Sequence, residues 1–173
     1  DLESGAELRR FEGHNASVNS LAVLAGGRRA LSGSSDSDRT LRLWDLESGA
    51  ELRRFEGHGE GVNSLAVLAD GGRALSGSDD GTLRLWDLES GAELRRFEGH
   101  GGWVTSLAVL ADGRRALSGS SDRTVRLWDL ESGADLACFI GDDSIFVVGV
   151  SPTANRAILG DTRGRVLTLA LPS

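Results

Sequence analysis

Short apolar runs, separated by turns rich in glycine and aspartate, predict that the chain is built from β-strands. Residues 62–68 are rich in valine, leucine and alanine, a composition typical of a strand that is covered on both faces. Asp70-Gly71-Gly72 has the chemistry of a turn and precedes a second predicted strand at residues 74–78. We therefore expect two neighbouring antiparallel strands joined by a tight turn.

A third and a fourth strand follow in the same unit. After a turn at residues 79–81, a third strand is predicted at residues 82–87, where Leu83 and Leu85 alternate with Arg84 and Trp86 in the period of two that is typical of a strand. Residues 89–91 predict a hairpin, because Gly91 can adopt a positive φ. Residues 93–98 carry enough charge to face water and to protect a sheet edge. The unit is predicted to be a four-stranded antiparallel sheet, ordered from inner to outer strand.

This unit recurs along the chain. The segment DLESGA begins at Asp1, Asp45, Asp87 and Asp129, so the repeats are 44, 42 and 42 residues long, and a diverged fourth copy follows. Self-similarity at this period, with one Gly-His and one Trp-Asp pair per unit, predicts the four-stranded blades of a β-propeller. The fold class is therefore all-β, with four blades in the chain.

The paired motifs resemble those of the WD40 family, and the resemblance covers the whole chain. Gly-His precedes Trp-Asp by 28 residues, or by 30 in the first copy. In that family a tetrad of His, Ser or Thr, Asp and Trp joins turns to strands. The resemblance implies three such tetrads here: His14, Ser32, Asp38 and Trp44; His58, Ser76, Asp80 and Trp86; and His100, Ser118, Asp122 and Trp128. In the first copy a two-residue insertion leaves Asp36 as an alternative to Asp38.

The last copy departs from this pattern. Asp142 stands where the histidine is expected, Leu159 replaces the serine, Arg163 the aspartate and Leu169 the tryptophan. Strand-like runs persist at residues 145–150, 157–159 and 166–171. We interpret this copy as a terminal blade without a tetrad, since diverged ends are expected in repeat proteins.

The two ends of the chain fit each other. We place a clasp strand at residues 1–14, the blades at 15–56, 57–98, 99–140 and 141–173, and all of them in one propeller module. WD40 proteins commonly complete their last blade with an N-terminal outer strand, here residues 6–12. Four blades in one ring need about 90° each and eight need about 45°, which is nearer to the usual wedge. We therefore predict a homodimer that exchanges clasp strands in one eight-bladed ring. A four-bladed monomer is the alternative.

Composition narrows the range of partners. A net charge of −7 argues against nucleic acid, and no apolar run reaches the length of a membrane span. The single cysteine, Cys138, cannot form an internal disulfide, which fits a reducing, cytoplasmic environment. All 19 basic residues are arginine, a bias that would suit a GC-rich, bacterial gene. The chain lacks methionine and shows no signal peptide, so we expect a module of a larger protein.

Catalysis and metal binding are not expected. Ser, His and Asp recur in each of the first three copies together with a structural Trp, which favours hydrogen-bond networks over a hydrolytic triad. The three histidines are all used in this way, which leaves none for zinc, and the acidic turns at residues 35–38 and 79–81 lack the ligand spacing of a calcium loop. We therefore predict no catalytic residue, no metal site and no cofactor.

Differences between the repeats point to a binding surface. Between residues 45–86 and 87–128, 35 of 42 positions are identical, and five of the seven differences lie in loops at one rim or at the start of the inner strand. In WD40 proteins this top face commonly grips peptides, although drift would produce the same pattern. The candidates are Trp103, Thr105, Arg123, Asn63, Glu60, Asp79, Asn19, Ser17 and Arg39.

We therefore expect a non-catalytic scaffold that binds an unknown protein or peptide through this face. The main alternative is a ligand-free unit whose property is self-assembly, because near-identical blades can exchange. A propeller that binds sugars or phosphate through Arg39 and Arg123 is a further possibility, ahead of an enzyme.

Overall fold

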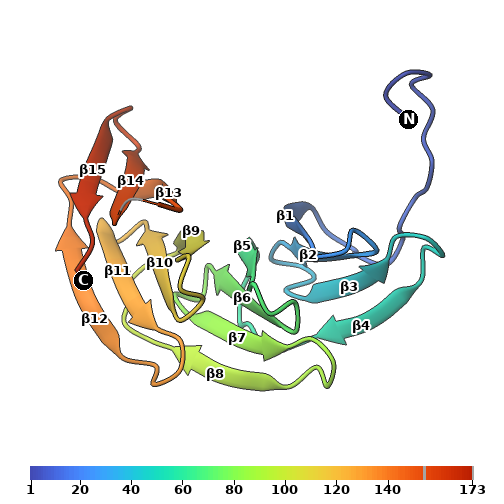
Figure 1. The fold of residues 1–173 in the computed structure, drawn as a ribbon, viewed down its shortest axis with the longest axis horizontal. Helices are drawn as coiled ribbons and strands as arrows, with labels where there is room; N and C mark the ends of the chain where they lie inside the picture. Colours follow the sequence, from blue (N-terminus) through green and yellow to red (C-terminus); the bar gives the residue numbers. More distant parts are fainter. Residues whose placement is uncertain (154, 173) are drawn as a thin grey trace.

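The computed structural model describes residues 1–153 and 155–172 and shows four antiparallel sheets arranged in an open arc (Figure 1). Within these ranges the chain forms fifteen strands and no helix. Blade 1 contains β1 (Val18–Val23), β2 (Arg29–Ser34), β3 (Leu41–Asp45) and β4 (Glu51–Phe55). Blade 2 contains β5 (Val62–Val67), β6 (Arg73–Ser78), β7 (Leu83–Asp87) and β8 (Glu93–Phe97). Blade 3 contains β9 (Val104–Val109), β10 (Arg115–Ser120), β11 (Thr124–Asp129) and β12 (Asp135–Ile140).

Blade 4 has three strands among the described residues. They are β13 (Ile145–Val150), β14 (Arg156–Asp161) and β15 (Val166–Ala170), and β15 pairs only with β14. In every blade the strand order in space is the order along the chain. The four strands predicted for the second repeat are confirmed to within one residue at each end.

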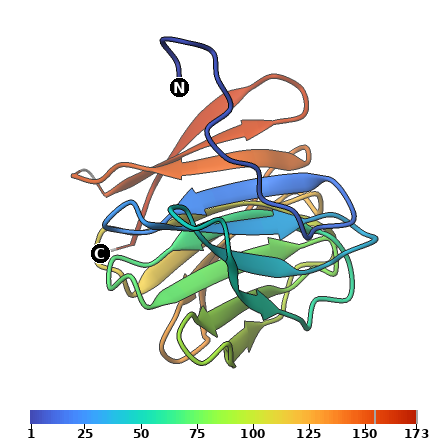
Figure 2. The same cartoon turned by 90° about the vertical axis from the view of Figure 1, so that its right-hand side faces the viewer.

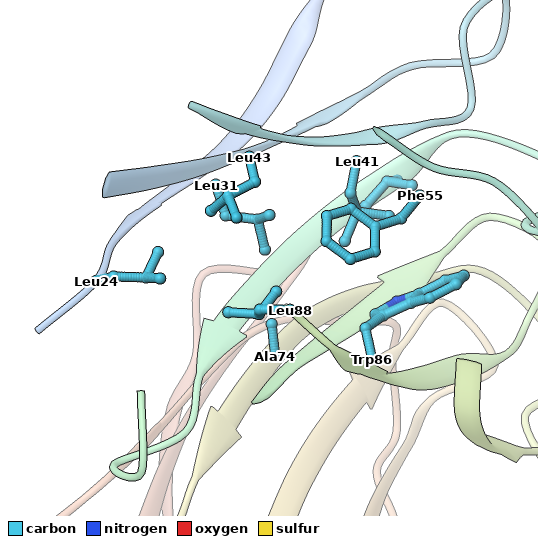
Figure 3. Packing of buried hydrophobic residues seen from close by; sticks show 9 residues of the cluster. Leu24, Leu31, Leu41, Leu43, Phe55, Ala74, Trp86 and Leu88 are labelled. Carbon is cyan, nitrogen blue, oxygen red and sulfur yellow. The ribbon is translucent and has the colours of Figure 1, made fainter. Parts of the chain in front are cut away.

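The core lies between neighbouring blades rather than within one blade. Between blades 1 and 2, Leu31, Leu41 and Phe55 of the first blade pack against Ala74 and Trp86 of the second (Figure 3). Equivalent clusters lie between blades 2 and 3 and between blades 3 and 4. Blades 2 and 3 therefore each bury one apolar face against the blade before and the other against the blade after, whereas blades 1 and 4 have a neighbouring blade on one side only.

The N-terminal segment lies outside the four sheets of the single chain. Residues 6–12, expected as an outer strand, form no strand within the single chain, and the first residues extend away from the sheets (Figure 2). A strand requires a hydrogen-bonded neighbour, and among the described residues no strand pairs with this segment. The segment still contacts blade 1, since the Phe11 ring meets the Trp44 ring edge to face at 5.7 Å.

Candidate functional site

The histidine networks are the first candidate site. In blade 2, His58 Nε2 lies 2.7 Å from Ser76 Oγ, and the indole N–H of Trp86 donates a 2.8 Å hydrogen bond to the same oxygen. The other ring nitrogen, Nδ1, lies 2.9 Å from Asp80 Oδ2. The network thus joins the loop before β5, the strands β6 and β7 and the turn between them. Blade 3 has the same arrangement in His100, Ser118, Asp122 and Trp128.

In blade 1 the structure shows which of the two candidate aspartates, Asp36 or Asp38, contacts the histidine. His14 Nε2 lies 2.7 Å from Ser32 Oγ, and Nδ1 lies 3.2 Å from Asp38 Oδ2. The Trp44 indole donates to Ser32 Oγ at 2.8 Å. Asp36 instead accepts a 3.1 Å hydrogen bond from the backbone N–H of Gly61 in the next blade. Asp38 therefore takes the acidic position, and Asp36 links blades 1 and 2.

Burial and hydrogen bonding set the charge state of the network. Burial lowers the pKa of His58 below its ordinary value of 6.5, although the Asp80 carboxylate partly offsets this. Burial would raise the pKa of Asp80, but hydrogen bonds from His58, Thr82 and the Gly59 backbone outweigh it and lower that pKa. At neutral pH the histidine is neutral and the carboxylate is charged. His58 therefore donates from Nδ1 to Asp80 and accepts the Ser76 hydroxyl at Nε2.

These contacts match those of a Ser-His-Asp triad, but the serine is inaccessible. Ser76 is fully buried, and the Trp86 indole holds the oxygen that would attack a substrate. A nucleophile must come within bonding distance of its substrate, and this one cannot. The network instead holds the loop before the inner strand against the second and third strands.

Three of the top-face candidates meet between blades 1 and 2. The Asn19 amide donates a 3.2 Å hydrogen bond to Asn63 Oδ1, and the Asn63 amide donates one of 2.6 Å to Asp79. Burial raises the pKa of Asp79, and the nearby charges of Asp36, Glu60 and Asp80 raise it further, although the Asn63 hydrogen bond opposes the shift. A patch of negative charge therefore lies on this part of the rim.

Trp103 adjoins this acidic patch. This residue is 61% exposed, and it lines a hollow of about 270 Å³ together with Asp79, Asp80 and residues of the loop at 100–102. Its backbone is fixed, because the Trp103 N–H donates to Ser121 Oγ at 2.8 Å. A large apolar ring is therefore held in water beside carboxylates.

The remaining candidates are spread along the rim. Thr105 Oγ1 donates to the carbonyls of Gly119 and Ile145, and Arg39 donates to the Gly59 carbonyl, so these side chains also hold the framework. Ser17 is exposed and accepts through its backbone carbonyl. Arg39 and Arg123 occupy equivalent turns of blades 1 and 3, separated by blade 2. Their φ angles are 57° and 72°.

The comparisons with known proteins bear on the whole fold. A family model described as "WD domain, G-beta repeat" matches residues 5–45, 49–87 and 91–129. The chain belongs to the WD40 family. No curated protein sequence is matched.

Solved structures share the arrangement of these WD40 blades. The structure of U3-55K is 24% identical and is matched with a TM-score of 0.87 over 95% of this chain and 52% of that one. This chain thus spans about half the length of U3-55K. The computationally designed Ika4 protein is 29% identical and is matched with a TM-score of 0.85 over 97% of this chain and 99% of Ika4.

An arginine of the third strand adjoins each network of this WD40 chain, a role that the alternation in that strand does not reveal; it is buried in blades 1 and 2 and half-buried in blade 3. Arg84 is buried, forms an ion pair with Glu93 and lies 3.8 Å from Asp80. The equivalent pairs are Arg42 with Glu51 and Arg126 with Asp135. In all three pairs the arginine precedes its carboxylate partner by nine residues, and this constant spacing is the sequence feature from which the pairs could have been predicted.

Blade 4 replaces the WD40 tetrad with apolar packing. Leu159 is buried and Leu169 packs against the cluster between blades 3 and 4. Asp161 pairs with Arg165 at 2.7 Å and lies at the end of β14.

Within the described ranges, no helix is long and apolar enough to cross a membrane.

Proposed function

We propose that this WD40 chain is a non-catalytic scaffold that binds a protein or peptide through the top face. The observation that carries the proposal is Trp103, which is 61% exposed on a fixed loop. The equivalent positions in blades 1 and 2 are Ser17 and Gly61, so the framework does not require a tryptophan there. Exposed aromatic side chains are typical anchors of protein interfaces.

The surroundings of Trp103 favour a basic partner. Asp79 lines the same hollow, and the charges of Asp36 and Glu60 act on Asp79. An aromatic face and nearby carboxylates together attract a guanidinium or ammonium group. We therefore expect the partner segment to place an arginine or lysine beside an apolar residue.

Peptide selection tests this proposal. Peptides selected from a random display library on the immobilised chain should be enriched in arginine or lysine, and Trp103→Ala should weaken their binding by about 10- to 100-fold. Leu94→Ala is the matched control, because Leu94 is an exposed apolar side chain on an outer strand. Equal affinities for the Trp103→Ala variant and the unmodified chain would refute the assignment.

Self-assembly is a second candidate function, and the two ends of the arc favour it. Large apolar side chains are exposed both on blade 1, at Leu21 and Val23, and on blade 4, at Ile158 and Val166. Contiguous exposed apolar surface is typical of an interface. Association of the purified chain with itself would support this function, and a monomer at high concentration would exclude it.

A further inference from the structure

The two ends of the arc are complementary surfaces. We propose that two copies of this chain close into one eight-bladed ring, with blade 1 of each copy packed on blade 4 of the other. The N-terminal segment, residues 6–12, then adds to β15 of the other copy as the outer strand of blade 4. This inference rests on self-assembly as the function and does not depend on binding at the top face.

Blade 1 exposes a face that the other blades bury. The strands β1 and β5 have the same sequence, VNSLAV. Val62 of β5 is 0% exposed because it packs on blade 1, whereas the equivalent Val18 of β1 is 47% exposed. The same residues are therefore available to pack against a preceding blade.

Blade 4 exposes the opposite face. By strand register, Val166 is the equivalent of Leu83, which lies in the core between blades 2 and 3. Val166 is 71% exposed, whereas Leu83 is 0% exposed. Val166 also lines an apolar hollow of about 260 Å³ together with Val147 and Ile158. This face resembles the surface on which a following blade packs.

The shape of each existing blade junction indicates how these two faces meet. A methyl group on Gly33 would lie 2.7 Å from Val62 of the next blade, and one on Gly77 would lie 2.5 Å from Val104. Each junction thus seats a valine or isoleucine of one blade on a glycine of the blade before. Gly160 and Val18 hold the equivalent positions at the two open ends. Val18 of one copy therefore suits Gly160 of the other.

The N-terminal segment already follows the path of an outer strand. Its sequence, AELRRFE, recurs at residues 50–56 and 92–98, which include β4 and β8. In β8, Arg95 donates to the Ser132 carbonyl of the next blade, and Arg9 donates to the equivalent Ser48 carbonyl at 2.8 Å. The Phe11–Trp44 ring distance of 5.7 Å also matches the 5.8 Å of Phe97–Trp128. The segment lies where the outer strand of a preceding blade would lie.

The register of the exchanged strand follows from blade 2. There Leu83 pairs with Phe97, and Leu85 pairs with Arg95. The same register places Phe11 opposite Val166 and Arg9 opposite Thr168 of the other copy. This pairing covers the outer edge of β15, an exposed edge of the kind that otherwise promotes aggregation.

A second copy is the occupant that serves both ends at once. The four blades form an arc with the N-terminal segment at one end and blade 4 at the other (Figure 1). They match 52% of the U3-55K chain with a TM-score of 0.87, so the four blades are arranged like about half of that longer chain. Twofold symmetry pairs each open end with its complement and leaves no edge free.

The solution mass tests the association, and matched variants test the surface. We expect light scattering over a dilution series to give twice the chain mass of 18.2 kDa. Ile158→Arg should raise the dimer dissociation constant by about 100-fold or more, because an unpaired charge in an apolar interface is costly. Leu94→Arg should leave the dissociation constant unchanged. Leu94 and Ile158 are both 49% exposed, but Leu94 lies on blade 2, which already has a neighbouring blade on each side.

Disulfide trapping tests the exchanged strand. Two proteins, each with Cys138→Ser, carry either Arg9→Cys or Thr168→Cys, are mixed and are oxidised. A disulfide-linked heterodimer is expected, and its absence with intact dimerisation would overturn the strand exchange. A persistent monomer would overturn both the ring and self-assembly. Mass that grows without limit as concentration rises would overturn the closed ring while leaving self-assembly intact, because an unclosed head-to-tail contact propagates.

Discussion

At the scale of residues, one serine hydroxyl in each of blades 1 to 3 organises a buried polar network. Ser76 contacts both His58 and Trp86, and all three side chains are buried. A buried polar group that loses its partner costs more than a single hydrogen bond is worth. The tetrad is therefore a point at which small changes have large effects on stability.

Removal of this hydroxyl gives a direct prediction. Ser76→Ala leaves the Trp86 N–H and the His58 Nε2 without their partner, so we expect the free energy of unfolding to fall by about 2–4 kcal/mol. Ser90→Ala is the control, because Ser90 lies in an exposed turn. Urea unfolding followed by tryptophan fluorescence measures both. A loss for Ser76→Ala no larger than that of the control would contradict the structural role.

The histidines also predict a pH dependence of stability. Burial lowers the pKa of His14, His58 and His100 below 6.5 in the folded chain. Below pH 6.5 the unfolded chain therefore binds more protons, and stability that is complete above this pH is lost as the pH falls toward the folded values. Each histidine contributes a slope of at most about 1.4 kcal/mol per pH unit.

Urea unfolding at a series of pH values measures this slope. We expect the unfolding free energy to fall steadily between about pH 6.5 and pH 5, before the carboxylates titrate. Hydrogen bonds that outweigh burial lower the pKa of Asp38 from 3.8 to about 2. Asp38 therefore adds a further loss of stability as the pH falls from about 3.8 toward 2. His58→Gln should flatten the upper slope. A flat unfolding free energy from pH 6.5 to 5 would contradict this account, because it would mean that the histidines take up protons equally in the folded and the unfolded chain.

At the scale of elements, the junction between blades depends on glycine. A methyl group on Gly77 would lie 2.5 Å from Val104 and 2.8 Å from Ser64. Gly77→Ala should therefore destabilise the chain by about 1–3 kcal/mol through overpacking. Gly101→Ala, where a methyl group meets nothing within 4 Å, should change the stability little. Thermal unfolding of the two variants compares them, and equal midpoints would show that the junction is not tightly packed.

Strand positions and tetrads were predictable from the sequence, because both depend on local pattern and on the repeat. Burial was less so. The strands β1 and β5 are identical in sequence, yet Val18 is half exposed and Val62 is fully buried. The difference lies in the neighbouring blade, which no local pattern encodes. For the same reason residues 6–12, which match β4 and β8, form no strand within one chain.

The candidate binding face was predictable only as a list of rim positions. Repeat differences single out Trp103, but they do not distinguish exposed side chains from those that hold the framework. Thr105 is such a case, because its hydroxyl links the Gly119 and Ile145 carbonyls of neighbouring blades. Arg84 shows the converse, since a charged residue in an alternating strand gives no sign that it is buried.

At the scale of the whole molecule, four WD40 blades form an arc whose two ends each expose apolar side chains. Blade 1 exposes Val18 and blade 4 exposes Val166, in positions that the inner blades bury. A closed ring would bury both and pair the edge of β15. The top face would then be present twice, so that a partner with two binding segments would bind with a higher effective concentration.

Small-angle X-ray scattering of the purified chain distinguishes a closed ring from an open arc. We predict a particle of twice the 18.2 kDa chain mass whose scattering profile matches a closed eight-bladed ring. A profile that matches the open four-bladed arc of a single chain, unchanged as the concentration rises, would contradict the closed ring.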